Sequence, residues 1–364
     1  MNLLIFYEKF RGGETIATAE IIANLQKKCV NVLEKQLSPP TSSSSYSYLY
    51  WLASSLSSSF LLLLKNPTTD IVYTTTFTAG LAAVILRPIF HFKIIFHYHG
   101  NRIPKKASRK LNIKTRLTQK AKRSICLIMQ NMLISRSNLI FLPNANLIAK
   151  FQKTKAKVVF LSNGINKKKY KLVVNTFSSK NILCIGRLDS GKNILSLISI
   201  FSKIKKKAGL EKIKLIIAYL PLRHAQEFEE KQKIINKISK LNLEKDVEMK
   251  ENASTNSLYN NASIVISFSK EEVLPLTLLE ALLFNKPFYF RSKKLTKLFP
   301  KNYLDNYYCK SNNQNVLLEH MAMALNIPKF EKQKLVADAK NQIHLNSWQR
   351  ISKKIITECN LLLK

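Results

Sequence analysis

The chain has 364 residues, of which 46% are apolar, and this is enough to fill two hydrophobic cores of ordinary domain size. Lysine and arginine outnumber aspartate and glutamate 59 to 22, for a formal net charge of +37. Five cysteines without CxxC spacing argue against a disulfide framework or a zinc site, and a reducing cytosol fits them. The sequence contains no uncharged apolar run of about 20 residues, and its first residues, MNLLIF, read as a strand rather than a signal peptide.

The first half of the chain predicts strands that alternate with helices. Arg11, Gly12 and Gly13 form a loop between the first strand and the first helix, where glycines let a ligand approach the backbone. His99 directly follows a strand, at the place where open α/β sheets bind ligands. The expected strands are 2–6, 71–74, 93–97, 138–142 and 157–161, and the expected helices are 14–28, 46–64, 79–86 and excursions within 105–133. Five serines interrupt 46–64, so we interpret it as an amphipathic or buried helix.

The second half repeats the alternation more clearly. Strands are expected at 181–185, 212–219, 247–249, 263–267 and 287–290, and helices at 193–207, 226–241, 255–261, from about Leu276, and at 346–363. Strand–helix alternation predicts parallel sheets with right-handed crossovers, hence an α/β fold of two doubly wound domains. We expect domains at 1–168 and 178–345, a linker at about 164–178, and a terminal helix at 346–364.

The positive charge is concentrated in the first half. No aspartate or glutamate occurs between Asp70 and Asp189. A/T-rich codons explain the many lysines but not the scarcity of glutamate, whose codons are also A/T-rich. Such a surface attracts polyanions, either nucleic acid or an anionic lipid leaflet. The densest basic segment, 105–123, contains Lys105, Lys106, Arg109, Lys110, Lys114, Arg116, Lys120, Lys122 and Arg123.

Two pairs of charged residues in the second half suggest a site. Glu272 and Glu280 stand eight residues apart, one in a loop after a strand and one about a turn into the next helix. Glu280 by itself could equally be a solvated helix residue. Arg187 and Lys192 flank an earlier strand-to-helix loop, where a guanidinium fork and an ammonium suit a diphosphate.

Together these motifs resemble the retaining GT-B glycosyltransferases of family GT4. The resemblance rests on GRLDSGKN, on SKEEVLPLTLLEALLFNKP with its E-x7-E pair, on the RGG loop, on FLSNGINKKKY between the halves and on NSWQRISKK near the end. The motifs occur in the family's order across nearly the whole chain. The resemblance implies a GT-B fold, with two Rossmann-like domains, a cleft between them and a C-terminal helix that packs back on the N-terminal domain.

The resemblance also implies roles for individual residues. Arg187 and Lys192 would grip the donor diphosphate and stabilise the leaving group, while Glu280 would bind the ribose and Glu272 would face the donor sugar. The donor would also meet Gly12, Gly13 and the loop around Leu274 and Leu276, with His99 near the transferred sugar. The family needs neither a metal nor a cofactor, since basic residues and helix N-termini neutralise the departing diphosphate.

This sequence departs from the family pattern at its glycines. It has eight glycines in all, and the EGFG that usually begins at the first motif glutamate is EVLP here. Pro275 therefore removes an amide that could donate to phosphate. Leu220, Pro221 and Leu222 replace the glycines expected after strand 212–219. These departures leave the recognised base open, and weak or lost activity is an alternative.

The sequence thus predicts an enzyme that transfers a sugar from a nucleotide-diphosphate sugar to a lipid-linked or anionic glycan acceptor. The context would be lipopolysaccharide or capsule synthesis, with the protein on the cytoplasmic face of the membrane. We expect the basic residues Lys105, Lys106, Arg109, Lys110, Lys114 and Arg116 to form the surface that meets acceptor or membrane. The alternatives are a nucleic-acid-binding protein and an inactive scaffold of the same fold. Against the first, the basic segment has no interleaved aromatic residues and the sequence contains no known nucleic-acid-binding motif.

Overall fold

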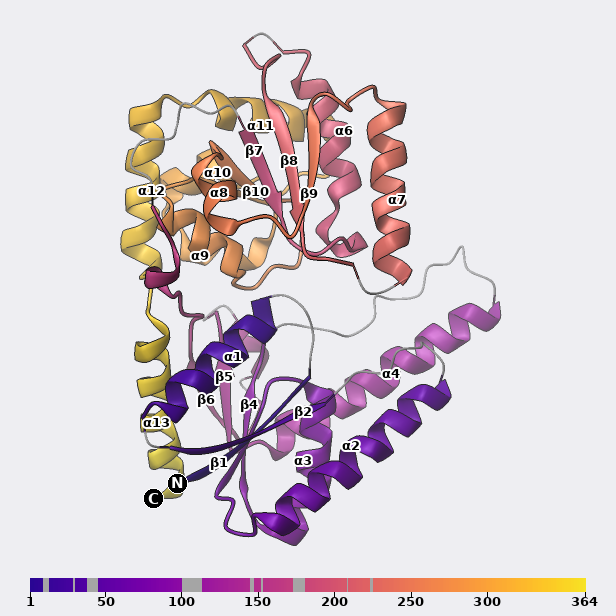
Figure 1. Ribbon diagram of the computed structural model, residues 1–364, viewed down its shortest axis with the longest axis vertical. Coiled ribbons are helices and arrows are strands. Elements are labelled where there is room, and N and C mark those ends of the chain that lie inside the picture. The colour runs from indigo at the N-terminus through magenta and orange to yellow at the C-terminus, as the bar shows by residue number, and fades with distance from the viewer. Residues whose placement is uncertain are drawn as a thin grey trace. The chain divides into compact units, whose positions relative to one another are not determined.

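The computed structural model describes residues 1–8, 13–28, 30–37, 45–99, 113–144, 147–151, 153–172, 181–207, 209–222 and 225–364. The chain divides into two compact units. Unit 1 consists of Met1–Gly164 together with Trp348–Lys364, and unit 2 is Ile165–Ser347. Each unit is a parallel sheet with helices on both faces (Figure 1).

The sheet of unit 1 has the strand order β2-β1-β3-β4-β5-β6, and every neighbouring pair is parallel. Its inner strands are continuous runs of buried side chains, as is usual for a parallel sheet covered on both faces. The strands are β1 (Asn2–Glu8), β2 (Asn31–Leu37), β3 (Ile71–Thr74), β4 (Lys93–His97), β5 (Leu139–Leu142) and β6 (Lys157–Phe160).

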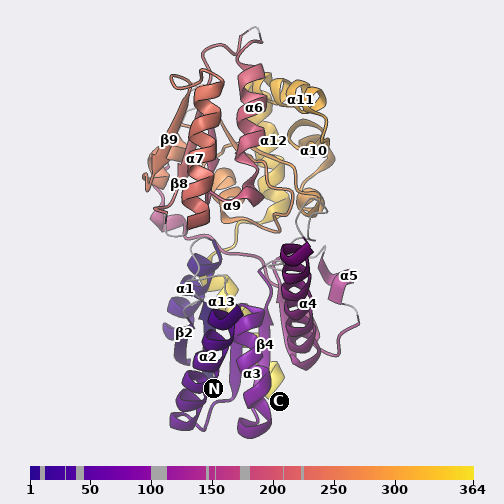
Figure 2. The ribbon, with the colours of Figure 1, turned by 90° about the vertical axis from the view of Figure 1, so that its right-hand side faces the viewer.

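Six helices of the described residues accompany this sheet. Helix α1 (Gly13–Gln26) packs against the C-terminal helix α13 (Trp348–Leu363), and α3 (Phe77–Phe90) packs against both α2 (Ser45–Lys65) and α4 (Ile113–Arg136). Right-handed crossovers place α1 on one face and α2, α3 and α4 on the other (Figure 2). The short α5 (Ile148–Phe151) lies between β5 and β6.

The sheet of unit 2 is also parallel throughout, in the order β11-β10-β7-β8-β9. Its strands are β7 (Asn181–Ile185), β8 (Lys214–Tyr219), β9 (Val247–Glu251), β10 (Ile264–Ser267) and β11 (Phe288–Phe290). The helices are α6 (Ile194–Ile204), α7 (Ala225–Lys240), α8 (Thr255–Asn260), α9 (Leu276–Leu283), α10 (Lys301–Tyr307), α11 (Gln314–Asn326) and α12 (Lys329–Ile343), with 3-10 turns η3 (Ser190–Lys192) and η4 (Lys293–Leu298). One apolar core joins these elements, and it includes the stacked rings of Phe290, Phe299 and Tyr303.

The predicted fold class is confirmed, because both halves of the chain are doubly wound parallel sheets. The structure adds a strand that the sequence analysis did not include, β2, at one edge of its sheet. Its side chains are mostly exposed or half-buried, so it lacks the apolar run that marked the other strands. The basic segment and the apolar segment after it were treated as separate excursions, but residues 113–136 form the single helix α4.

The serine-interrupted segment 46–64 is helical, within α2. Ser55 and Ser59 are buried in it, while Leu61 and Leu64 are exposed. Among the helices of the described residues, none combines the length and apolarity needed to span a membrane.

Close packing joins the two segments of unit 1. Gly164 lies at the end of the first segment and Trp348 at the start of the second. A Cβ atom built on Gly164 would come within 2.7 Å of Cδ2 and 3.0 Å of Cα of Trp348, which is 3% exposed. By contrast, a Cβ atom on Gly80 would meet only side-chain carbons of Leu133, which can move.

We therefore predict that Gly164→Ala destabilises the protein by about 1–3 kcal/mol, the usual cost of overpacking a filled site. Because the obstacle includes the backbone of α13, Trp348 cannot relieve the clash by changing its side-chain rotamer. Urea denaturation followed by circular dichroism measures the loss. Gly80→Ala is the matched control: its Cβ approach is closer, at 2.4 Å, but involves only the Leu133 side chain, and combining it with Leu133→Val should relieve the clash. Equal stability of Gly164→Ala and the parent protein would contradict the packing argument.

Candidate functional site

The candidate site lies at the carboxyl edge of the sheet in unit 2. Strands β7 and β10 are adjacent and parallel, with Ile182 opposite Ile264 and Leu183 opposite Val265. The loops that follow them therefore leave the sheet side by side. The first loop carries Arg187 and Lys192, and the second carries Glu272.

The first loop is held by its own backbone and by one aspartate. Asp189 caps the 3-10 turn η3, and its Oδ1 accepts a hydrogen bond from the Gly191 N–H at 2.9 Å. Leu188 is 1% exposed and anchors the loop in the core. Arg187 lies at the surface, with Nη2 3.3 Å from Oδ2 of Asp189. The Arg187 side chain is thus half-exposed, and the Asp189 carboxylate that it contacts is also partly exposed to solvent.

Lys192 and Glu272 form an ion pair across the two loops. The Lys192 Nζ lies 2.5 Å from Oε1 of Glu272, and both side chains are largely shielded from solvent. The hydroxyl of Ser292, after β11, donates to the backbone carbonyl of Glu272 at 2.7 Å. Two residues that the sequence analysis had assigned to one donor site, 80 positions apart, are therefore in direct contact.

Glu280 lies in α9 and binds two tyrosines. Its Oε1 accepts a hydrogen bond from the Tyr170 hydroxyl and its Oε2 one from the Tyr259 hydroxyl, each at 2.7 Å. Burial raises the pKa of Glu280, whereas the two hydroxyls and the nearby Lys169 act in the opposite direction. Glu280 is therefore not a solvated helix residue.

The two tyrosines are held by one aromatic ring. Phe284, one turn after Glu280 on the same helix, stacks on Tyr259 with ring centroids 5.1 Å apart and meets the edge of Tyr170 at 5.6 Å. The sequence analysis did not include either tyrosine in the site. Tyr170 closes the FLSNGINKKKY segment, but no spacing rule links a tyrosine hydroxyl to a glutamate 110 residues away, as for Tyr170, or 21 residues away, as for Tyr259.

Pro275 stands at the N-cap of α9, and the helix begins at Leu276 as predicted. The preceding side chains, Val273 and Leu274, are buried and fix the loop from below. Pro275 offers no N–H group, so the amides available at this edge are those of the first turn of the helix.

A shallow pocket lies between the two loops, over the ends of β7 and β10. Phe268 and the side chain of Cys184 form part of its floor. Burial raises the pKa of the Cys184 thiol to about 12, so it stays protonated and is no nucleophile. The pocket is lined by Cys184, Ile185, Gly186, Arg187, Lys192, Ile194, Ala218, Ile266, Ser267 and Phe268.

Arg291, after β11, is a further cation at this edge, and the sequence analysis did not single it out. It is 5% exposed, and its Nη2 donates to the Ser311 carbonyl at 2.5 Å and to Oδ1 of Asn312 at 3.1 Å. Its guanidinium lies 5.2 Å from the ring centre of Phe268, which lines the pocket. Burial lowers the pKa of Arg291.

The residues assigned to unit 1 lie at the carboxyl edge of its own sheet. Gly13 begins α1, whereas Gly12 lies outside the described residues. His99 follows β4 and its ring lies 4.0 Å from that of His97, centre to centre. His97 is fully buried, its Nδ1 is 2.6 Å from the Tyr73 hydroxyl, and burial holds its pKa well below the usual range. His97 is therefore neutral and supports His99 from beneath.

The proposed acceptor and membrane surface lies outside the described residues. Lys105, Lys106, Arg109 and Lys110 lie outside the described residues, as do the side chains of Lys114 and Arg116. Within the described part of the chain, no three His, Cys, Asp or Glu side chains gather in a way that could hold a metal ion.

Comparison with known proteins assigns unit 2 to a family. Residues 174–342 match the model of the family described as glycosyl transferases group 1. This segment is a glycosyl transferases group 1 domain. The residues at the edge of its sheet, Arg187, Lys192, Glu272 and Glu280, all fall within the match. No curated protein matches the sequence closely enough to count as a relative.

Solved structures extend the likeness to the whole chain. A sucrose-phosphate synthase from Thermosynechococcus elongatus superposes with a TM-score of 0.80 at 14% identity, over 100% of this chain and 99% of its own. The Anabaena protein HepE, in complex with UDP-glucose, gives a TM-score of 0.70 at 14% identity, over 99% and 100%. A glycosyltransferase from Rickettsia africae gives 0.69 at 16% identity, over 100% and 99%. The chain therefore has the GT-B fold of these proteins.

For the group 1 domain, we predict that Tyr170→Phe and Tyr259→Phe each lower the free energy of unfolding by about 1–3 kcal/mol. Each change removes one hydrogen bond to the Glu280 carboxylate and keeps the ring. Urea denaturation measures the loss. Tyr307→Phe is the matched control, since the buried hydroxyl of Tyr307 has no hydrogen-bond partner in the structure. Equal losses in all three variants would contradict the assigned contacts.

Proposed function

We propose that this protein is a retaining, metal-independent glycosyltransferase that moves a sugar from a nucleotide-diphosphate sugar to an acceptor. The observation that supports this most is the contact between Lys192 and Glu272 beside Arg187, at the carboxyl edge of a group 1 domain. It joins a diphosphate-binding pair of cations to a carboxylate at one pocket, which is where a donor's phosphate and sugar would adjoin.

In this mechanism the cations carry the departing charge. Arg187 binds diphosphate oxygens with its fork, and Lys192 adds a point charge to the oxygen that leaves the sugar. In the absence of donor, Glu272 neutralises the Lys192 ammonium at 2.5 Å. Donor binding would replace that contact, so that Glu272 turns to the sugar hydroxyls while Lys192 turns to phosphate.

Glu280 would bind the ribose of the nucleotide. Each oxygen of a carboxylate accepts two hydrogen bonds, so one tyrosine hydroxyl on each leaves capacity for a ribose hydroxyl. The tyrosines would fix the carboxylate's orientation before the donor arrives. Because burial raises the pKa of Glu280, the two hydroxyls also help to keep it ionised.

Unit 1 would bind the acceptor. We assign Gly13 and Gly12 to the donor diphosphate and His99 to the transferred sugar. No carboxylate in the donor pocket lining is placed as a nucleophile, so rate enhancement would come from positioning and from stabilising the leaving group.

The acceptor we propose is lipid-linked or otherwise anionic, and the context is cell-surface polysaccharide synthesis at the cytoplasmic face of the membrane. The absence of any acidic residue between Asp70 and Asp189 supports this proposal. Basic residues near an anionic leaflet contribute about 1 kcal/mol each. An inactive scaffold is the second candidate, because Lys192, Glu272 and Glu280 already have partners within the chain.

The test is donor binding and turnover with UDP-, GDP- and ADP-sugars. We expect one class to raise the melting temperature, since a bound ligand stabilises by mass action. UDP-glucose is the first choice, because HepE binds it in the same fold. Arg187→Ala and Lys192→Ala should weaken that binding by roughly 10- to 100-fold, as expected for lost hydrogen bonds to charged groups.

Glu280→Ala should likewise weaken the shift. Lys240→Ala and Glu229→Ala, on the exposed side of α7, remove the same charges away from the pocket and should leave the shift unchanged. Equal binding by all variants would refute the site. Binding without release of the nucleotide diphosphate in the presence of acceptor would favour the scaffold.

A further inference from the structure

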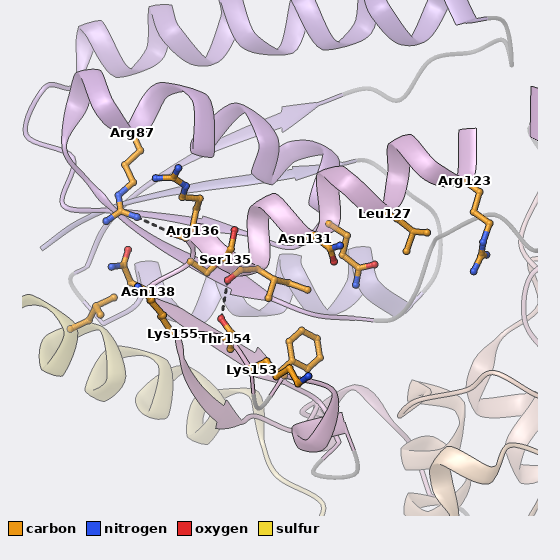
Figure 3. A pocket seen from close by; sticks show the side chains of 15 residues that line it. Arg87, Arg123, Leu127, Asn131, Ser135, Arg136, Asn138, Lys153, Thr154 and Lys155 are labelled. Atoms are coloured by element: carbon orange, nitrogen blue, oxygen red, sulfur yellow. Dashed lines mark hydrogen bonds between the residues drawn. The ribbon is translucent and has the colours of Figure 1, made fainter. Parts of the chain in front are cut away.

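Unit 1 contains a large cavity, separate from the small donor pocket in the group 1 domain. It has a volume of about 1060 Å³ and lies between α4, the α5–β6 connection and the end of α13 (Figure 3). Asn138, directly before β5, and Lys155, just before β6, are in its lining. The cavity therefore opens at the amino edge of the sheet, whereas His99 lies at the carboxyl edge.

The lining of this cavity is strongly basic. Five cations face it, and no aspartate or glutamate is among its lining residues in the described part of the chain. Figure 3 shows Arg87 and Arg136 at one end, Arg123 at the other and Lys153 between them. Arg123 and Arg136 stand thirteen residues apart on α4, which is about 20 Å along the helix. The cations are Arg87, Arg123, Arg136, Lys153 and Lys155.

Hydrogen bonds also fix the walls of this cavity. The Arg87 Nη1 donates to the Arg136 carbonyl at 2.8 Å, which ties α3 to the end of α4. On the other wall, the Thr154 hydroxyl donates to the Ile134 carbonyl at 3.1 Å (Figure 3). Two polar side chains of the lining, Gln130 and Ser137, are 3% and 6% exposed. The walls are thus fixed on both sides of the basic interior.

Apolar side chains complete the lining. Leu127, Ile134, Phe151 and Leu362 stand among the cations. A simple inorganic anion would contact the cations and leave these apolar side chains exposed to water. A ligand that carries a phosphate on an apolar stem would use both.

The outer surface of α4 points to the source of such a ligand. Ile125, Ile128 and Met132 are exposed by 56%, 58% and 41%, at the i, i+3, i+7 spacing of one helical stripe. At 100° per residue this stripe occupies the flank of α4 away from Leu127 and Ile134, which face the cavity. Exposed aliphatic side chains on a helix rich in basic residues are typical of helices that lie in a membrane interface.

We propose that this cavity binds the phosphate headgroup of an anionic membrane lipid while the aliphatic stripe of α4 enters the lipid surface. The site deepens the membrane association proposed above and does not depend on sugar transfer. It would be a further contact with the membrane, on the opposite edge of the sheet from His99. It would hold unit 1 in a fixed orientation on the leaflet from which a lipid-linked acceptor is taken.

The test is co-sedimentation of the full chain with phosphatidylcholine vesicles, with and without an equal share of phosphatidylglycerol, at physiological ionic strength. Lys153→Ala/Lys155→Ala removes two exposed cations of the cavity. Lys27→Ala/Lys28→Ala removes two exposed lysines at the end of α1, on the other face of the sheet, as the matched control. We expect the cavity variant to bind the anionic vesicles at least tenfold more weakly than the control, from about 1 kcal/mol per basic residue.

Ile125→Ser/Ile128→Ser should weaken binding as well, and the thermal shift with UDP-glucose should be unchanged in all these variants. Equal weakening by the two lysine pairs would mean diffuse attraction and would overturn the cavity while leaving membrane association standing. No vesicle binding by the parent protein would overturn both, and the UDP-glucose shift would still judge donor binding separately. A melting shift with inorganic phosphate that the cavity variant loses, without vesicle binding, would identify a soluble anion and refute the lipid.

Discussion

The parallel pairing of β7 with β10 is the constraint on which the candidate donor site depends. These strands are about 80 residues apart in sequence, yet their pairing delivers the loop of Arg187 and Lys192 to the loop of Glu272. Two hydrogen bonds then hold these loops in shape. Asp189 caps η3 in the first loop, and the Ser292 hydroxyl donates to the Glu272 carbonyl in the second. Lys192 and Glu272, which would each be solvated in an unfolded chain, form one ion pair at the edge of the sheet.

The sequence could predict those elements whose apolar residues repeat with a clear period, because a parallel sheet needs continuous buried strands. It predicted α9 to its first residue and placed Lys192 with Glu272 in one site. It could not predict β2, since this strand has mostly exposed or half-buried side chains and no apolar run, nor Tyr170 and Tyr259 as partners of Glu280. A hydrogen bond between side chains distant in sequence has no periodic pattern. The bonds from Arg291 to Ser311 and Asn312 are of this kind, so the sequence did not indicate Arg291 as part of the site. The roles of Glu272, Glu280 and His99 in catalysis stay predictions.

The uneven charge acquires a physical meaning in two basic pockets of the described residues, one in each unit. In unit 2 the cations of the donor pocket are matched by Glu272 and Asp189. In unit 1 the cations along α4 line a cavity without any acidic residue in the described part of the chain. In the proposed mechanism, the donor diphosphate replaces Glu272 as the partner of Lys192, and such an exchange favours specificity. The cavity of unit 1 leaves a standing positive potential, which favours rapid capture of an anionic surface.

The contact between Gly164 and Trp348 has a consequence for synthesis of the protein. Unit 1 is completed by the last residues of the chain, whereas unit 2 is contained in one continuous segment. Since chains emerge from the ribosome N-terminus first, unit 2 can finish folding while unit 1 still lacks α13. The face of the sheet that α13 will cover, next to α1, stays open until α13 has been synthesised. Emergence of α13 from the ribosome is thus the event that closes the core of unit 1.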